Sequence, residues 1–223
     1  MLGPVSSGPT LLVTGFGPFL GNAENPSEHL AHAVSAHHDL GVRFVPVAPL
    51  PVVFGAAAAR VLEVSEGLDA PVATLALGLA SRASHVRLER LARNRSSAND
   101  PDALGVRGEG RAVHPGGPEV LACPLPLEAL GEALARAGFS WSVSEDAGGY
   151  VCNDLYYRLL HAHHLGRTLR EGALGAGKTG PHASAPPTVF VHVPPDAHRM
   201  PGLARALAEG MVAAVAGPKM ESR

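Results

Sequence analysis

The sequence predicts a single α/β domain, a sandwich in which helices cover a largely parallel sheet. Short apolar runs alternate along the chain with helix-length amphipathic segments, which is typical of strand–helix–strand units. The run over 72–77 is almost wholly apolar, as expected of a strand buried on both faces. No internal repeat and no shift of composition divides the 223 residues, so we expect one domain over 1–223.

A glycine-rich loop joins the first expected strand to the first expected helix. The strand covers 11–13, and the helix begins at Asn25, with Pro26 in the first helical position and Glu28 reaching back toward the cap. The loop invites comparison with a dinucleotide-binding turn. However, its third glycine comes one place late and no acid follows the second strand, so we reject that interpretation.

The later elements continue the alternation. The expected strands cover 42–47, 72–77, 85–91, 141–143 and 188–193, and the expected helices cover 52–66, 127–137, 151–164 and 203–215. The segment 94–118 is polar and rich in turn residues, which predicts a long loop. The segment 166–187, rich in glycine, alanine and proline, is interpreted as a flexible loop insertion.

Composition and charge exclude several classes of function. The chain is 46% hydrophobic and 17% charged, which is typical of a globular protein. A net charge of −2 gives no basic footprint for nucleic acid or a membrane surface, and no apolar run has the length of a membrane span. The N-terminus lacks the features of a signal peptide, and two cysteines make no disulfide framework. We therefore expect a cytoplasmic protein.

A phosphate-binding pattern, GxxxxGK[ST], occurs at 172–179, and a nucleotide-binding protein is therefore a rival function. That chemistry needs a hydrophobic strand before the loop and a helix after it. Here the polar segment 166–171 precedes the pattern and the proline-rich segment 180–187 follows it, so the context argues against this function. His161 and His164 give only two metal ligands with no carboxylate nearby in sequence, so we expect no metal and no cofactor.

The strongest functional signal is Cys152, which follows Gly148-Gly149-Tyr150-Val151 at the start of an expected helix. A thiol in this position lies at the positive end of the helix dipole, which favours the thiolate. The free backbone N–H groups of the same turn could hold an oxyanion. This arrangement predicts a cysteine nucleophile. The alternative is a buried structural cysteine, which is the more frequent role of a lone cysteine and the one we expect for Cys123.

A thiolate nucleophile needs a partner that takes and later delivers a proton. His192 is the best candidate, because it lies at the C-terminal end of a buried strand, where catalytic groups of α/β sheets gather. A hydrogen-bonded core histidine is the alternative. Glu89 is one option for the carboxylate that orients the base. The residues alone favour the other interpretation of Glu89, an exposed strand acid paired with Arg87 or Arg90.

Four segments occur in an order that is specific only when they are taken together. They are LVTGFGPF at 12–19 with Asn25-Pro26, ERLARN at 89–94, GYVCN at 149–153 with Tyr156-Tyr157, and FVHVP at 190–194. A weaker fifth match is GGP at 116–118. With these segments, which span 10–195, the chain resembles the pyroglutamyl peptidase I (pyrrolidone-carboxylate peptidase) family.

The resemblance implies a three-layer α/β/α sandwich with a mostly parallel twisted sheet. It also implies a homo-oligomeric cysteine peptidase, a dimer or tetramer, that removes N-terminal pyroglutamate from peptides through a thioester. Carried over by position, Cys152 would be the nucleophile, His192 the general base and acid, and Glu89 the orienting carboxylate. The pocket for the pyrrolidone ring would consist of Phe16, Phe19, Tyr150 and Val151. Aromatic faces suit a flat, uncharged lactam.

The chain departs from the family pattern in its loops. Gly17 stands where family members usually carry an acidic residue, and the segment 98–103 lacks the arginine that helps hold the oxyanion in the family. Losing one oxyanion donor costs about two to three orders of magnitude in rate. Asn99, Arg95 or Arg107 could supply the missing donor. The alternative function is therefore a catalytically altered or inactive family member that binds a lactam-like ligand.

Overall fold

The computed structural model describes residues 8–19, 23–97, 99–172 and 185–217, and its centre is a six-stranded sheet with the order β2-β1-β3-β8-β4-β7. Four neighbouring strands are parallel, β2 (Arg43–Leu50), β1 (Thr10–Phe16), β3 (Ala73–Leu79) and β8 (Thr188–Val193). The last two, β4 (Val86–Glu89) and β7 (Trp141–Ser144), are parallel to each other and antiparallel to β8. A small antiparallel sheet pairs β5 (Leu91–Arg93) with β6 (Val120–Ala122).

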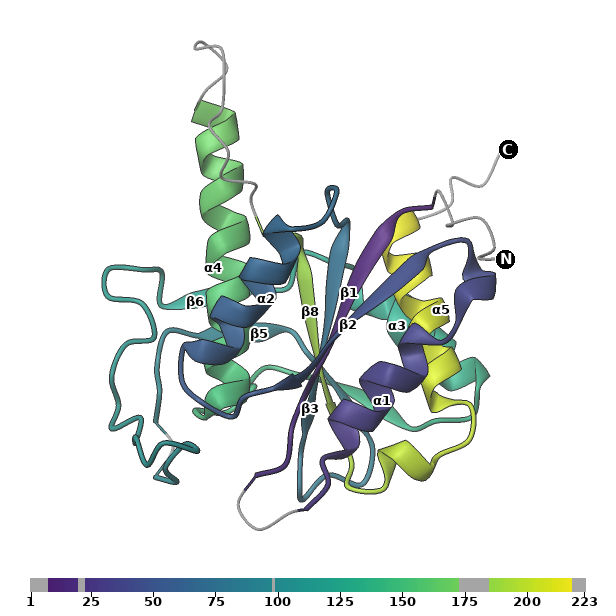
Figure 1. The fold of residues 1–223 in the computed structure, drawn as a ribbon, viewed down its shortest axis with the longest axis horizontal. Coiled ribbons are helices and arrows are strands. Elements are labelled where there is room, and N and C mark those ends of the chain that lie inside the picture. Colours follow the sequence, from purple (N-terminus) through teal and green to yellow (C-terminus); the bar gives the residue numbers. More distant parts are fainter. Residues whose placement is uncertain (1–7, 20–22, 98, 173–184, 218–223) are drawn as a thin grey trace.

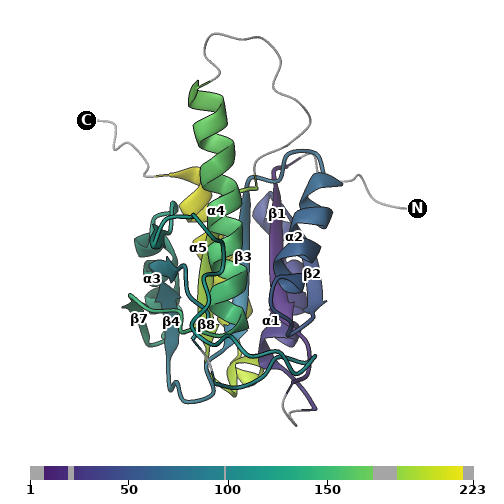
Figure 2. The ribbon, with the colours of Figure 1, turned by 90° about the vertical axis from the view of Figure 1, so that its left-hand side faces the viewer.

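Helices cover both faces of the large sheet, as expected of a three-layer α/β/α sandwich (Figures 1 and 2). One face carries α1 (Pro26–Ser35), α3 (Leu127–Arg136) and α5 (Leu203–Ala216), and the other carries α2 (Ala56–Glu66) and α4 (Val151–Gly172). Short 3₁₀ segments cover His38–Leu40 and Ala197–Arg199. Among the described residues, no helix has both the length and the apolarity needed to cross a bilayer.

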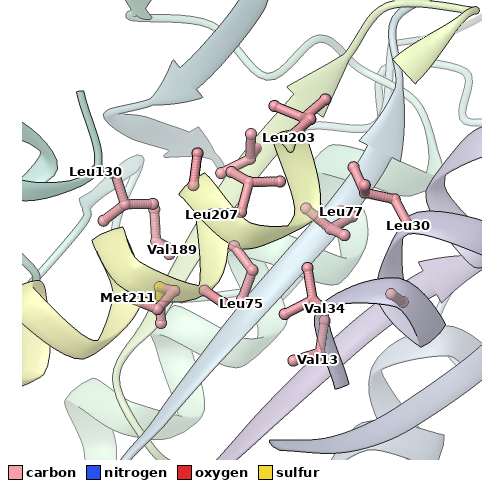
Figure 3. Close-up of a cluster of buried hydrophobic side chains, with 14 of the residues drawn as sticks. Val13, Leu30, Val34, Leu75, Leu77, Leu130, Val189, Leu203, Leu207 and Met211 are labelled. Carbon is pink, nitrogen blue, oxygen red and sulfur yellow. The ribbon is translucent and has the colours of Figure 1, made fainter. Parts of the chain in front are cut away.

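The two faces of the sheet have separate hydrophobic cores. Leu75, Leu77 and Val189 contact the helices of the α1–α3–α5 face, where Leu207 and Met211 of α5 complete the cluster (Figure 3). Ala76 and Phe190 belong to the core under α2 and α4. Because side chains alternate along a strand, residue 192 shares the face of residue 190 and points toward α4. The candidate base is thereby directed to the helix that carries Cys152.

The start of α1 anchors the loop that follows β1. The Asn25 side chain accepts a hydrogen bond from the backbone N–H of Ser27, as the N-cap prediction requires, and its amide donates to the Gly17 carbonyl at 3.0 Å. The Ser27 hydroxyl in turn accepts from the backbone N–H of Phe16. A Cβ on Gly15 would lie 2.2 Å from the Ser27 carbonyl oxygen, so this close approach requires glycine.

Several element boundaries differ from the sequence predictions. α4 continues to Gly172, so the loop interpretation of 166–187 is wrong over 166–172, where leucine, arginine and glutamate support a helix. α4 projects well beyond the sheet in Figures 1 and 2. The remainder of the expected insertion that spans 173–184, with most of the phosphate-binding pattern, lies outside the described residues.

Two further differences lie near the site. The expected helix 52–66 begins only at Ala56, because Gly55 has a φ of +76° and precedes it as a non-helical cap. The expected strand 85–91 is two strands, β4 and β5, separated at Arg90. β6 was not expected at all, and it pairs with β5 beside the long loop. In its described residues, that loop over 94–118 contains only one isolated bridge, between Ser96 and Arg111.

Candidate active site

Cys152 is the second residue of α4, as the sequence predicts. The first intrahelical hydrogen bond recorded at this end runs from the Asp154 N–H to the Tyr150 carbonyl at 3.1 Å. The backbone N–H groups of residues 151–153 precede that bond and are not used by the helix ladder. They lie beside the half-buried thiol, where a developing negative charge could be held.

Two glycines shape the turn before Cys152. Gly148 has a φ of +84°, in the left-handed region that favours glycine, and its N–H donates to the Asp146 carboxylate at 2.9 Å. A Cβ on Gly149 would lie 2.0 Å from the hydroxyl of Ser97, whose backbone N–H donates to the Gly149 carbonyl. The glycine pair is therefore needed to bring the helix start against the loop 94–118.

Two buried polar side chains fix α4 immediately after the thiol. Asn153 accepts from the Arg93 N–H at 2.9 Å and donates to the Arg93 carbonyl at 2.8 Å, which ties α4 to β5. Asp154 accepts from the Gly55 N–H at 2.7 Å, just before α2, and pairs with Arg158 at 3.0 Å. Since neither side chain can move without losing these bonds, the position of Cys152 is well defined.

His192 and Glu89 form a buried hydrogen-bonded pair. The His192 Nδ1 atom lies 2.7 Å from Glu89 Oε1. In the strand register Glu89 lies opposite Phe190, so its side chain reaches His192 diagonally across β4 and β8. The side chain of Glu89 is 0% exposed, which makes the interpretation of an exposed strand acid wrong. Arg87 is nevertheless within 3.2 Å of the same carboxylate oxygen, so Glu89 has both partners.

The His192 ring is the positively charged member of the group at neutral pH. Burial alone lowers the pKa of this imidazole, but hydrogen bonds to the Cys152 thiol and the Glu89 carboxylate outweigh burial and raise the pKa to about 9. With Nδ1 bonded to Glu89, Nε2 is the ring nitrogen left for the thiol. An imidazolium between a carboxylate and a sulfur atom favours a thiolate–imidazolium pair, the activated form of a cysteine nucleophile.

Gly78 on β3 makes room for this group. It lies beside His192 in the parallel register. A Cβ added to Gly78 would lie 3.0 Å from Cys152 Sγ and 2.7 Å from the Phe190 ring. Glycine, which has no side chain, therefore stands at the point of β3 against which the Cys152 thiol lies.

We expect Gly78→Ala to slow alkylation of Cys152 by iodoacetamide by about ten- to a hundred-fold, because a misplacement near 1 Å can cost this much. The added methyl group must displace the sulfur or the Phe190 ring. Gly67→Ala is the control, since Gly67 has a φ of −79° and an added Cβ would meet nothing closer than 3.6 Å. Equal alkylation rates in the two variants would contradict the prediction.

A cavity of about 270 Å³ opens beside the thiol. Its described lining consists of Phe16, Phe19, Glu24, Asn25, Val52, Leu79, Ser81, Asp100, Tyr150, Val151 and Cys152. All four residues expected to form the ring pocket are in this set. Leu79 and Ser81 were not expected in this pocket, although their position at and just after the carboxyl end of β3, next to the strand of His192, was a usable signal.

The aromatic wall of the cavity is held in place by the neighbouring loops. The Phe19 and Tyr150 rings lie 5.4 Å apart between centroids, and the Phe54 ring meets Tyr150 edge-on at 5.7 Å. The Tyr150 hydroxyl donates to the Pro101 carbonyl at 2.8 Å. Burial raises the pKa of Tyr150, so the hydroxyl stays protonated as this hydrogen bond requires.

The loop segment after residue 98 is anchored by Asp102. Its buried carboxylate accepts hydrogen bonds from the backbone N–H groups of Phe54, Leu104 and Val106. Burial raises the pKa of Asp102, but these three bonds lower it by more, and the pKa lies below its usual value. The carboxylate thereby fixes Pro101, the hydrogen-bond partner of Tyr150.

The expected replacement for the missing oxyanion arginine is not found. Among the described residues that line the cavity there is no arginine or lysine, and Asn99 is not one of them. The Arg107 side chain is bonded to the Asn99 carbonyl. Arg95 lines a separate cavity of about 430 Å³ together with Arg93 and Glu119. The N–H groups at the start of α4, which the helix ladder does not use, are donors adjacent to Cys152 in the chain.

The second cysteine and the histidine pair considered as metal ligands have other surroundings. Burial raises the pKa of the Cys123 thiol, whose sulfur lies 3.6 Å from the carbonyls of Leu125 and Thr188. His161 packs against His114 with ring centroids 4.2 Å apart. Within the described ranges, no three His, Cys, Asp or Glu side chains converge as a metal site would require.

Known proteins with a similar sequence or structure share one activity in their names. A family model described as pyroglutamyl peptidase matches residues 10–175. Pyrrolidone-carboxylate peptidases of Gloeobacter violaceus and Cupriavidus taiwanensis are 36% and 34% identical over 157 and 166 residues, covering 70% and 74% of this chain and 75% and 76% of theirs. Pyroglutamyl peptidase I of Bacillus amyloliquefaciens matches with a TM-score of 0.75 at 26% identity, over 93% of this chain and 97% of that one. A mutant pyrrolidone carboxyl peptidase of Pyrococcus furiosus gives 0.73 at 27% identity, over 93% and 98%.

Proposed function

The chain belongs to the pyroglutamyl peptidase family of cysteine peptidases, and from this premise we propose that Cys152, His192 and Glu89 remove N-terminal pyroglutamate from peptides. One observation supports the assignment most directly. The Cys152 thiol lines an aromatic cavity and acts on the ring of a histidine that is itself hydrogen-bonded to a buried glutamate. Nucleophile, proton carrier and orienting carboxylate are then in one connected group.

The reaction that this group supports has two stages. The Cys152 thiolate attacks the carbonyl carbon of the bond between the pyroglutamyl residue and the next residue, not the lactam carbonyl. The His192 imidazolium gives its proton to the departing amine as that amide bond breaks. This leaves a pyroglutamyl thioester and a neutral imidazole. The imidazole then takes a proton from water as the hydroxide oxygen attacks the thioester. Pyroglutamic acid leaves, and the thiolate–imidazolium pair is restored.

The cavity fits the ring of such a substrate. Phe16, Phe19 and Tyr150 offer aromatic faces to a flat lactam, and Val151 adds an apolar contact next to the nucleophile. Because the cavity lining has no cationic side chain among the described residues, we assign the oxyanion to the N–H groups that begin α4. These N–H groups alone stabilise the oxyanion less than they would together with an arginine. We therefore expect a modest turnover number.

The experiment that tests the function is release of a fluorophore from pyroglutamyl-aminomethylcoumarin, with and without prior treatment with iodoacetamide. We expect turnover that the thiol reagent abolishes. The matched substrate is prolyl-aminomethylcoumarin, which has the same ring size but lacks the lactam carbonyl and carries a charged amine, and we expect it to be a poor substrate. No turnover with the ring still bound would favour the catalytically altered family member. Absence of both would contradict the function.

Other properties implied by the family remain predictions for this chain. A homo-oligomer, dimer or tetramer, is checked by light scattering, and a cytoplasmic location by cell fractionation. The nucleotide-binding alternative rests on 172–179, of which only Gly172, the last residue of α4, lies in the described part of the chain. An ATP titration of the parent and of Lys178→Ala decides that alternative, which is removed if neither protein binds ATP.

A further inference from the structure

Arg87 contacts the same Glu89 carboxylate that is hydrogen-bonded to His192. Arg87 and Glu89 are two residues apart on β4, so their side chains share a face of the sheet. In the antiparallel register Arg87 lies directly across from His192. Its Nη2 atom is 3.2 Å from Glu89 Oε1, the same oxygen that is bonded to His192. One carboxylate oxygen therefore lies between a guanidinium and an imidazole.

The guanidinium is held in this position by residues at the end of β7. Nη2 donates to the Ser144 hydroxyl at 2.8 Å and to the Asp146 carbonyl at 3.0 Å. Ser144 is paired with Glu89 in the parallel register of β4 and β7. Asp146 also bonds Gly148, in the turn that leads to Cys152. Arg87 thus joins the carboxylate to the segment that delivers the nucleophile.

We propose that Arg87 is a positioning residue of the catalytic group, which fixes Glu89 against His192 and limits how strongly that carboxylate stabilises the imidazolium. The proposal rests on the function assigned above to Cys152, His192 and Glu89. Arg87 itself does not line the substrate cavity. It acts through Glu89.

The need for a second partner follows from the burial of Glu89. Its side chain is fully buried, and its Oε2 atom has no hydrogen-bond partner among the described residues. A buried carboxylate with one oxygen left unpartnered is costly, and a second adjacent cation offsets that cost. With the imidazole hydrogen-bonded to Oε1 and the guanidinium ion-paired with the same atom, the carboxylate is held with this oxygen toward His192.

The charge of Arg87 also opposes that of the imidazolium. A like charge close to a cationic group disfavours its protonated form, and Arg87 is directly across the strand pair from His192. The other ionisable groups recorded as acting on His192 are Cys152 of α4 and Glu89 of β4. Of the charged groups nearby, Asp154 of α4 pairs with Arg158, and Glu145 and Asp146 after β7 pair with Arg90 and Arg93.

The test measures the rate at which iodoacetate alkylates Cys152 between pH 5 and 10.5. Iodoacetate is an anion, so its attack is favoured by the imidazolium and slows when His192 loses its proton. The pH at which the rate falls reports the charge state of His192 without any substrate turnover. A Cys152→Ser chain gives the background rate from Cys123. An absence of peptidase activity would then contradict the function without deciding the role of Arg87.

In Arg87→Gln we expect the alkylation rate to decline at a pH about half a unit to one unit higher than in the parent, since a cation next to the imidazolium has been removed. In the coumarin assay, the same variant should lose about ten-fold in kcat with little change in KM, because Glu89 is no longer fixed while the cavity is intact. Arg87→Lys retains the charge but not the guanidinium geometry. In this variant the alkylation rate should decline at the same pH as in the parent, and kcat should be partly reduced.

Arg90→Gln is the matched control. Arg90 follows Glu89, is about half exposed and pairs with Glu145 at 3.5 Å, so its loss changes net charge equally without touching the Glu89 carboxylate. If Arg87→Gln is folded and its alkylation rate declines at the same pH as that of Arg90→Gln, the proposal is wrong. If Arg87→Gln fails to fold, Arg87→Lys decides. A reduced kcat, with an alkylation rate that declines at the same pH as in the parent, supports the proposal. An unchanged kcat overturns it.

Discussion

Replacing Cys152 with alanine is expected to reduce turnover of a pyroglutamyl substrate to the uncatalysed background, a loss of about four orders of magnitude or more. The reaction needs the sulfur to form the thioester, and nothing else on the cavity wall can take its place: the described lining holds one cysteine, and Ser81 is exposed and lies beyond the end of β3. The measurement is coumarin release under saturating substrate.

The fold should survive this substitution. Alanine is the best helix former, and Asn153 and Asp154 still anchor the start of α4 through their own hydrogen bonds. We therefore expect an unchanged circular dichroism spectrum and a melting temperature within a few degrees of the parent. Cys123→Ala is the control, because Cys123 is distant in sequence and bonded to carbonyls of its own surroundings. Activity retained in Cys152→Ala, or lost in a folded Cys123→Ala, would contradict the assignment.

The position of Cys152 could be predicted from the sequence because its signals are local. Two glycines before a helix pattern define the turn, and the structure uses both, one for its positive φ and one for its contact with Ser97. His192 was predictable for a related reason: it is the last residue but one of a buried strand, which places it at the carboxyl edge of the sheet. Local patterns and one general topological rule were sufficient for both.

Glu89 could not be assigned in the same way, because its burial depends on the path of the whole chain. β4 runs antiparallel to β8 and at the same time lies between β8 and β7, and nothing in residues 86–89 predicts either neighbour. β6 was missed for the same reason, since three residues form a strand there only because β5 lies beside them. The resemblance to a family supplied the role of Glu89, and the geometry supplies its partners.

The length of α4 shows the opposite error, in which a composition was given too much weight. Glycine and proline are frequent over 166–187, but the first part of that segment, 166–172, contains residues that are compatible with a helix and continues α4. The segment 98–103 lacks the arginine of the family pattern. Its expected substitutes lie elsewhere, because Arg107 bonds the Asn99 carbonyl and Arg95 belongs to another cavity.

Replacing Glu89 with glutamine is the second change with a large expected effect. We expect kcat to fall by about two to four orders of magnitude, because the imidazole loses the charge that orients it and stabilises its protonated form. Glutamine keeps the size of the side chain and an oxygen that can accept from His192 Nδ1, so the packing around β4 and β8 should persist. The measurement is kcat for the coumarin substrate at several pH values.

The pH profile separates loss of charge from loss of packing. The carboxylate of Glu89 helps to raise the pKa of His192 to about 9, against the effect of burial. In Glu89→Gln that pKa must fall, so the alkaline decline of activity and of alkylation by iodoacetate moves to lower pH. Arg87→Gln is expected to move the same decline to higher pH. Opposite shifts from two neighbouring residues on one strand cannot come from a general loosening of the site, since this would weaken both variants without moving the decline in two directions. A shift of both variants in the same direction would contradict the arrangement in which Arg87 and His192 share the Glu89 carboxylate.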